Sequence, residues 1–263
     1  MKKVKIAIVA LLCAGSILFT SCGNSVATDL NSSSDVVKNT AESESQQEEK
    51  QPYEILREKE NETKQIASDE EQQVKELKDA LNELGFFYSE VDGMGDVLMG
   101  ISPHCDEAAE QGESCILPCL YLLGPSIDPV IVVGFTYIAD EYIDMDTVEI
   151  DTDNYRYTRG VADNTHKTKM TINNGQTEKL AEVAFSSAIE DDLDALVDIV
   201  KSSGVQITFA KYDTVKPELV ECEMPEEDKQ AITDVLNAYY LYLNASEKSR
   251  AKALADVEAI EAE

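Results

Sequence analysis

Four cysteines beyond residue 100 are the residues whose type and spacing could most directly do chemistry. Cys105, Cys115 and Cys119 stand close together, and Cys222 follows much later. They could pair as disulfides or remain as free or redox-variable thiols. The first three could instead bind metal, since His104 would complete a set of four zinc ligands with them. The Cys-x-x-Cys spacing that is usual for a structural zinc site is absent, and the adjacent His104 and Cys105 cannot easily point the same way. The pattern therefore favours disulfides over metal.

Carboxylates are the second possible source of chemistry. The 263 residues hold 52 Asp and Glu against 22 Lys and Arg, a formal net charge of -30, so spacing alone singles out no acid–base pair. The two histidines, His104 and His166, allow a dyad of Cys105 with His166 and little else. The G-x-S-x-G, H-E-x-x-H, Walker and complete G-x-G-x-x-G motifs are missing. We therefore predict no catalytic residues and no cofactor, and expect binding rather than catalysis.

Clustered acids raise calcium as a further candidate. Asp140, Glu141, Asp144 and Asp146 lie close together, and the stretch 151–155 begins like a calcium-binding loop. A calcium-binding EF-hand loop needs glycine at its sixth position and glutamate at its twelfth, where this chain has arginine and alanine. Acids that alternate along strand edges more often form a solvated surface that resists aggregation. We predict no metal site.

The N-terminus has the layout of a secretory signal. Lys2, Lys3 and Lys5 precede the uncharged run Ile6–Phe19. That run is shorter than the roughly 20 residues with which a helix crosses the hydrocarbon core of a bilayer. It therefore favours a signal peptide over a membrane-spanning helix.

The end of this run resembles a bacterial lipobox. Phe19-Thr20-Ser21-Cys22 places an apolar residue and two small ones before a cysteine, although phenylalanine stands where leucine is usual. The resemblance implies that residues 1–21 are removed and that Cys22 becomes a diacylated, palmitate-bearing N-terminus. Two acyl chains suffice for stable anchoring. It thus implies a lipoprotein on the extracytoplasmic face of a bacterial cell membrane.

This location bears on the remaining cysteines. Cys13 leaves with the signal and Cys22 carries the lipid, so an even number remains, outside the cytoplasm, where disulfides form. The disulfide candidates are Cys105, Cys115, Cys119 and Cys222, and they have three possible connectivities. If Cys105 pairs with Cys115 or Cys119, the remaining cysteine could reach Cys222 and join it to the early strands.

The segment between the lipid site and the body has two parts. Residues 22–51 are rich in Ser, Asn, Gln and Glu, and we predict a flexible acidic tether. Residues 52–85 predict a helical segment, whose stripe of Val74, Leu77 and Leu81 is too short for a coiled coil and indicates packing on the domain. Gly85 is typical of a helix end.

Residues 86–263 form the globular body. Short apolar runs predict strands over 97–101, 116–123 and 130–139, and alternation predicts a hairpin of 148–150 with 155–157. A further strand around 170–172 turns toward 180–185, and another covers 205–209. Helices are predicted after Ser187, after Pro225 and, beyond a break at 244–246, to the C-terminus. The pattern predicts an α+β fold: a mainly antiparallel sheet with helices packed on one face, preceded by the disordered tether and the N-terminal helix.

The functional prediction follows from charge and location. The strongly negative charge repels nucleic acid, so we expect none as a partner. We predict a lipid-anchored extracytoplasmic interaction or accessory module that meets the membrane through its diacylglyceryl group and binds an envelope protein or small ligand. A solute-binding receptor is the first alternative, and a carboxylate-dependent envelope hydrolase the second. Tyr155 and Tyr157, two apart on one hairpin face, could contribute an aromatic patch or simply pack on a neighbour.

Overall fold

The fold is known from a computed structural model. It describes residues 70–91, 95–105, 112–161, 167–173, 178–187, 190–212 and 215–261. The predicted signal peptide (1–21), the lipid site Cys22, the predicted tether (22–51) and the first part of the predicted helical segment (52–69) lie outside the described residues.

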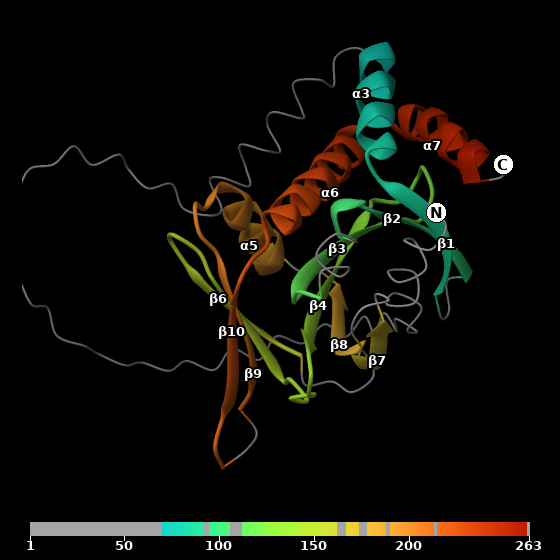
Figure 1. Cartoon of the computed structure of the whole chain (residues 1–263). Coiled ribbons are helices and arrows are strands. Elements are labelled where there is room, and N and C mark those ends of the chain that lie inside the picture. The colour runs from blue at the N-terminus through green and yellow to red at the C-terminus, as the bar shows by residue number, and fades with distance from the viewer. Residues whose placement is uncertain are drawn as a thin grey trace, which may run out of the picture.

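The larger sheet has six strands in the order β1-β2-β3-β4-β8-β7, and every neighbouring pair is antiparallel. Its strands are β1 (Gly85–Val91), β2 (Gly95–Ile101), β3 (Cys115–Leu122), β4 (Val130–Ala139), β7 (Lys167–Asn173) and β8 (Glu178–Ser187). Figure 1 shows this sheet curving from β1 on one side of the molecule round to β8 and β7. Its first four strands follow one another along the chain, as expected when short turns join antiparallel neighbours.

The smaller sheet has four strands in the order β10-β9-β5-β6, again all antiparallel. Its strands are β5 (Thr147–Asp151), β6 (Arg156–Gly160), β9 (Gln206–Lys211) and β10 (Glu218–Glu223). The β5–β6 hairpin arises from the alternating apolar positions that the sequence shows on both sides of residues 152–155. The hairpin of β9 and β10 projects from the body of the molecule (Figure 1).

Four helices complete the described part of the fold: α3 (Glu70–Asn82), α5 (Glu190–Lys201), α6 (Glu226–Asn244) and α7 (Glu247–Glu261). α3 packs against α6 and α7, and its Leu77 and Leu81 are buried. α6 lies against β3 of the six-stranded sheet and also contacts α5. Among the described helices, none combines the length and the low polarity that a bilayer crossing requires.

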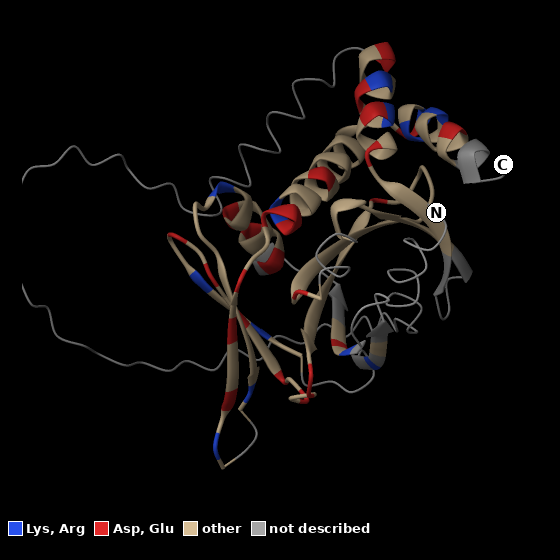
Figure 2. Cartoon of the chain, viewed as in Figure 1, with Lys and Arg blue, Asp and Glu red and all other residues tan. Residues whose placement is uncertain are grey.

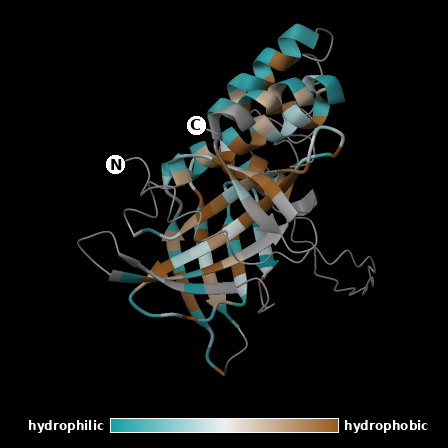
Figure 3. Ribbon diagram, turned by 90° about the vertical axis from the view of Figure 1, so that its right-hand side faces the viewer, coloured by the Kyte–Doolittle hydropathy of each residue, from teal (hydrophilic) through white to brown (hydrophobic). Residues whose placement is uncertain are grey.

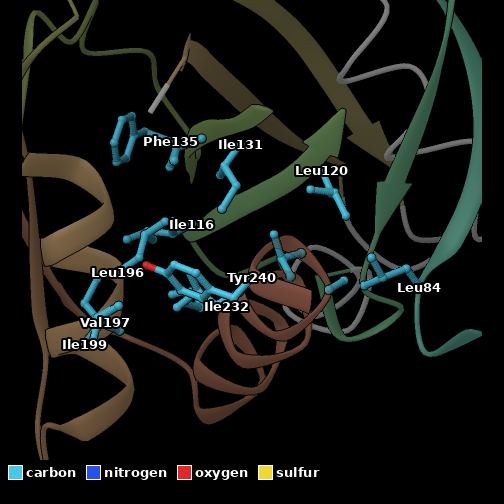
Figure 4. Packing of buried hydrophobic residues seen from close by; sticks show 14 of the residues in the cluster. Leu84, Ile116, Leu120, Ile131, Phe135, Leu196, Val197, Ile199, Ile232 and Tyr240 are labelled. Carbon is cyan, nitrogen blue, oxygen red and sulfur yellow. The ribbon is translucent and has the colours of Figure 1, made fainter. Parts of the chain in front are cut away.

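The main core lies between the six-stranded sheet, the helices and the inner face of the four-stranded sheet. Figure 4 shows residues of β3 and β4 in this core, with Leu196, Val197 and Ile199 of α5 and Ile232 and Tyr240 of α6. A second cluster, including Met99, Leu117 and Val132, occupies the other face of the six-stranded sheet. β3 is therefore buried along both faces, and hydrophobic residues concentrate on the strands (Figure 3).

The predicted α+β class with antiparallel pairing and packed helices is confirmed. The strands and helices that the sequence predicts are also present within the described residues. The strands form two sheets rather than one, and two strands were not predicted. They are β10, whose exposed residues are mostly acidic, and β1, whose first residue Gly85 was interpreted as a helix end. Two boundary predictions were wrong. Gly85 begins β1 instead of ending the helix, and Ser187 ends β8 instead of capping α5, because pairing with neighbouring strands outweighs local capping.

Candidate functional site

The disulfide prediction was wrong: Cys105, Cys115, Cys119 and Cys222 are all free thiols. Cys115 and Cys119 lie four residues apart on β3, which at about 3.3 Å per residue is too far for the 4.4–6.8 Å Cα separation that a disulfide needs. Cys105 lies in the turn after β2, and Cys222 lies on β10 of the other sheet. Proximity along the sequence was therefore misleading, because an extended strand separates its own cysteines.

Two of these thiols are poor nucleophiles. Burial, reinforced by the carboxylate of Asp228, raises the pKa of Cys115 well above its ordinary value and that of Cys222 to about 11. Thiols with such pKa values stay protonated at neutral pH and neither attack electrophiles nor readily bind metal. Cys115 therefore acts as a small buried side chain, and Cys222 as a partly buried one.

The other candidate residues also lie apart. Among the described residues, no group of three or more His, Cys, Asp or Glu side chains is placed to hold a metal ion. Asp140 and Asp144 of the acidic cluster pair with Lys179 and Lys169, and the carboxylate of Asp146 accepts a hydrogen bond from the backbone N–H of Tyr212. His166, the other half of the possible Cys–His dyad, lies outside the described part of the chain.

A cavity of about 280 Å³ lies where α5 crosses the two sheets, and we refer to it as the α5 cavity. It is lined by residues of four elements: Val133 and Phe135 of β4, Val148 and Ile150 of β5, Arg156, Tyr157, Thr158 and Arg159 of β6, and Asp192, Asp194, Ala195 and Leu196 of α5. Its volume is close to the lower end of the range for small-molecule sites. It contains Tyr157, one of the two tyrosines that the sequence suggested as an aromatic patch.

The floor of the α5 cavity is apolar. On β5 burial alternates, so that Val148 and Ile150 point inward while Glu149 between them is only half-buried. Phe135 of β4 is 3% exposed and Leu196 of α5 is 2% exposed. Figure 4 shows the side chains of Phe135 and Leu196 between β4 and α5. The floor therefore offers an apolar group a dry surface to pack on.

The rim of the α5 cavity carries opposite charges. A guanidinium nitrogen of Arg159 lies 3.3 Å from a carboxylate oxygen of Asp192, and both side chains are largely shielded, at 27% and 16% exposure. Asp194, one residue beyond Leu193 on α5, lines the same wall with a buried Oδ1 atom. The hydroxyl of Tyr157 is also buried at this cavity. Cation, carboxylate and hydroxyl thus converge over one apolar floor.

The hairpin turn fixes the C-terminal end of α5. The hydroxyl of Thr152 donates to the buried carboxylate of Asp198, while the backbone N–H of Ser203 donates to Asp153 at 2.6 Å. The Ser203 contacts also hold the pKa of Asp153 below its ordinary value. Because Arg159 and Asp192 tie β6 to the other end of α5, the helix is held at both ends and the cavity lies between the two attachments.

Tyr155 and Tyr157 have different roles. Their rings lie 6.0 Å apart at an interplanar angle of 48°. Tyr157 packs against the main core and lines the cavity, as the packing interpretation of this pair predicted. Arg156, which lies between them, makes two hydrogen bonds to the carboxylate of Asp151, at 2.5 and 2.7 Å, on the solvent side.

Sequence reasoning missed the arginines of this site. Arg156 and Arg159 stand three apart in a chain where acids outnumber basic residues by 52 to 22, and that rarity was the available signal. It also missed Asp228, whose acidic neighbours at the start of α6 resemble ordinary first-turn anions. Tertiary burial, which no local pattern reports, gives Asp228 its unusual environment.

Comparison with known proteins identifies no relative. No family model, no curated protein and no solved structure matches the chain.

Proposed function

We propose that this chain is a lipid-anchored extracytoplasmic binding module that takes a small ligand in the α5 cavity. The observation that carries the proposal is the cavity itself: about 280 Å³, with an apolar floor and a charged rim. Small-ligand sites combine these two features, since apolar walls supply affinity and a few polar groups fix orientation.

The cavity favours the solute-binding alternative over a module that binds only through an open surface. It does not favour the hydrolase. Glycosidic hydrolysis needs two carboxylates flanking the scissile bond, whereas Asp192 and Asp194 lie two residues apart on one helix wall. The anchoring part of the proposal rests on the resemblance of Phe19–Cys22 to a lipobox.

Ligand entry is tested with the fluorescent probe 1-anilinonaphthalene-8-sulfonate on the detergent-solubilised full-length chain. Detergent micelles also take up the probe, so its fluorescence in detergent alone is subtracted. We expect saturable binding with a stoichiometry of one. Ala195→Leu, which adds a larger side chain to the cavity wall, should abolish it, and Ala251→Leu on the exposed face of α7 should not. Equal probe binding by both variants, or none by the wild type, would refute the cavity as a ligand site.

The anchor is tested separately by metabolic labelling with palmitate. Wild type should take up label and Cys22→Ala should not. Equal label in both would remove the lipid from the proposal and leave the binding site unaffected.

A further inference from the structure

We infer that the end of the β9–β10 hairpin is a second membrane contact, which inserts shallowly into the bilayer to which Cys22 is predicted to anchor the chain. We call this part the hairpin tip and define it as Lys211, Tyr212 and residues 215–219. The inference rests on the anchoring part of the proposed function, because the anchor brings the domain to a bilayer. It goes further by assigning the side of the domain that faces the lipid.

The hairpin tip carries a cluster of exposed apolar side chains. Among the described residues, five large hydrophobic side chains are exposed, and three of them lie here: Tyr212 at 42%, Leu219 at 52%, and Val215, which is fully exposed. Leu219 pairs with Ala210, and Tyr212 follows Ala210 by two residues, so Leu219 and Tyr212 lie on the same face of the hairpin. Single exposed hydrophobic residues are ordinary, whereas a cluster indicates an interaction surface.

The hairpin tip stands clear of the rest of the fold. β9 pairs with β5 only as far as Ala210, whereas its pairing with β10 continues to Lys211 and Glu218. Figure 1 shows the hairpin projecting at the opposite end of the molecule from α3 and α7. An apolar surface on a narrow projection can enter a bilayer without bringing the acidic body against the lipid headgroups.

The hairpin tip also differs from the rest of the chain in charge. Residues 211–219 hold two lysines and two acids, so this stretch is neutral in a chain whose formal net charge is -30. Figure 2 shows basic residues at the end of the hairpin. Charges more than about 8 Å away are largely screened at physiological ionic strength, so the acids of the helices act only weakly at the tip. The tip can therefore touch a bilayer that the acidic surfaces avoid.

The side chains along the hairpin favour shallow insertion. Tyr212 suits the interface between lipid and water, because its ring is apolar while its hydroxyl donates to Glu149 at 2.8 Å. Glu221 and Glu223 are exposed on β10. Glu221 lies two residues from Leu219, about 7 Å along the strand, and would remain in water when Leu219 is buried. Insertion therefore ends within the roughly 5–10 Å that interfacial segments occupy.

A zwitterionic bilayer fits this tip better than a second copy of the chain. Two hairpins that met through their exposed sides would bring Glu218, Glu221 and Glu223 of both copies together, and like charges at such short range oppose pairing. A bilayer of phosphatidylcholine has no net charge to repel these acids. Its fluid acyl region also needs no preformed pocket to receive a convex apolar tip.

The test uses tryptophan as a reporter, because the chain has none. The full-length chain with Val215→Trp is reconstituted in phosphatidylcholine vesicles, with and without brominated acyl chains. We expect its emission to shift to shorter wavelength on vesicles and to lose about half or more of its intensity to the brominated lipid, as for a shallowly inserted side chain. Ile127→Trp is the matched control and should show neither change. Ile127 is 48% exposed, and its carbonyl accepts a hydrogen bond from Arg250 of α7, far from the tip.

A second substitution identifies the force that holds the tip. Leu219→Asp, added to Val215→Trp, should abolish the shift and the quenching, whereas Ile127→Asp in the same background should leave both unchanged. Salt at 0.5 M should change neither signal, because apolar contact is not screened. A signal that salt removes would overturn apolar insertion and indicate attraction through the lysines.

The remaining outcomes separate this inference from the proposed function. Identical emission with and without vesicles would overturn the membrane contact, while uptake of palmitate at Cys22 would leave the anchor standing. A shift that appears without vesicles and grows with protein concentration would also overturn it, in favour of a second copy. Quenching that persists with excess vesicles in the Cys22→Ala background would support the contact even if the palmitate label is absent.

Discussion

The two sheets of this molecule use opposite side-chain patterns. β3 is buried at every position and β4 at all but its ends, whereas β5 and β6 alternate between inward and outward residues. In the sequence the first pattern is a continuous apolar run and the second an alternation. The six-stranded sheet therefore has both faces covered along its centre, whereas the four-stranded sheet has only one face covered.

The difference explains where the cavity forms. Strands that are buried on both faces need compact apolar side chains, and β3 and β4 supply them. On β6 the inward positions are instead Tyr157 and Arg159, whose long side chains end in polar groups. The guanidinium of Arg159 pairs with Asp192 and the hydroxyl of Tyr157 is buried, so these side chains do not fill the space beneath α5 as valine or isoleucine would. The cavity thus arises at the boundary between the two patterns.

Acidic residues follow the same division. Figure 2 shows them spread over the helices and the four-stranded sheet, with few on the central strands β3 and β4. On the smaller sheet they lie on the outward face, as with Glu149 and Asp151 of β5 and Glu221 of β10. The charge that dominates the composition is therefore carried by surfaces that fold around an apolar interior.

The largest expected effect is on the free energy of unfolding, and it contrasts one leucine-to-alanine substitution in each sheet. Leu120→Ala on β3 should lower the free energy of unfolding by about 2–5 kcal/mol, because Leu120 is fully buried and the deletion leaves a cavity. Leu219→Ala on β10 should change it by less than about 0.5 kcal/mol, because that side chain is 52% exposed. Urea titration of the full-length chain measures both. Similar losses in the two variants would mean that the exposed hairpin face is covered in solution.

Asp228 is the next test, because it places a carboxyl group against the buried start of β3. The backbone N–H of Ile116 donates to its Oδ2 atom at 2.8 Å, and its Oδ1 atom is buried without a hydrogen-bond partner among the described residues. Burial, opposed by the Ile116 bond and reinforced by the nearby Glu227, raises the pKa of Asp228 to about 7. Between pH 4 and 7 the folded protein therefore holds a proton on Asp228 that the unfolded chain has released.

The sign of the pH effect follows from this proton. The stabilisation is complete below the ordinary pKa of 3.8 and is lost as pH rises through the folded value of about 7, so stability should fall between pH 4 and 7. The loss is on the order of a few kcal/mol, since each pKa unit corresponds to about 1.4 kcal/mol. Asp228→Asn keeps an acceptor for Ile116 and should remove this slope, while Asp79→Asn on the exposed face of α3 should retain it. Melting temperatures between pH 4 and 8 give the measurement.

Most of the fold could be predicted from the sequence because it is recorded in local periodicity. The runs 116–123 and 130–139 and the alternation at 148–150 gave β3, β4 and β5 to within one residue at each end, and the alternation at 155–157 located β6. α6 was predicted from Pro225 and its apolar stripe. β10 was missed, since a strand with four of its six residues exposed or acidic acquires its pairing only from β9.

The candidate site could be predicted only in parts. Tyr157 was considered as part of an aromatic patch, but nothing local indicates that its strand and the later helix α5 meet across β4. The disulfide prediction was wrong for a related reason: residues that are close in sequence can be far apart in space. Their closeness in sequence suggested a disulfide, whereas the extension of β3 keeps Cys115 and Cys119 apart. Long-range placement decides both results, and single-sequence patterns do not contain it.

The smallest expected effect concerns Asp151, on the outward face of the four-stranded sheet. Two hydrogen bonds from the Arg156 side chain hold the pKa of Asp151 below its ordinary value. The sign is therefore opposite to that of Asp228: the stabilisation is present above pH 4 and is lost as pH falls below that value. Because the pair is exposed, with Arg156 at 65%, solvent and salt screen it strongly.

Asp151→Asn should accordingly leave the melting temperature at pH 7 within error of the wild type. It should flatten only a shallow decline below pH 4, and 0.5 M salt should remove even that difference. Comparing it with Asp228→Asn separates the two sheets by the direction of their pH dependence. The contribution of Asp228, at the start of β3, is lost as pH rises, and the contribution of Asp151, on the outward face of the four-stranded sheet, is lost as pH falls. A large loss at neutral pH for Asp151→Asn would show that the outward face is not solvent-exposed, because only a desolvated pair could account for it.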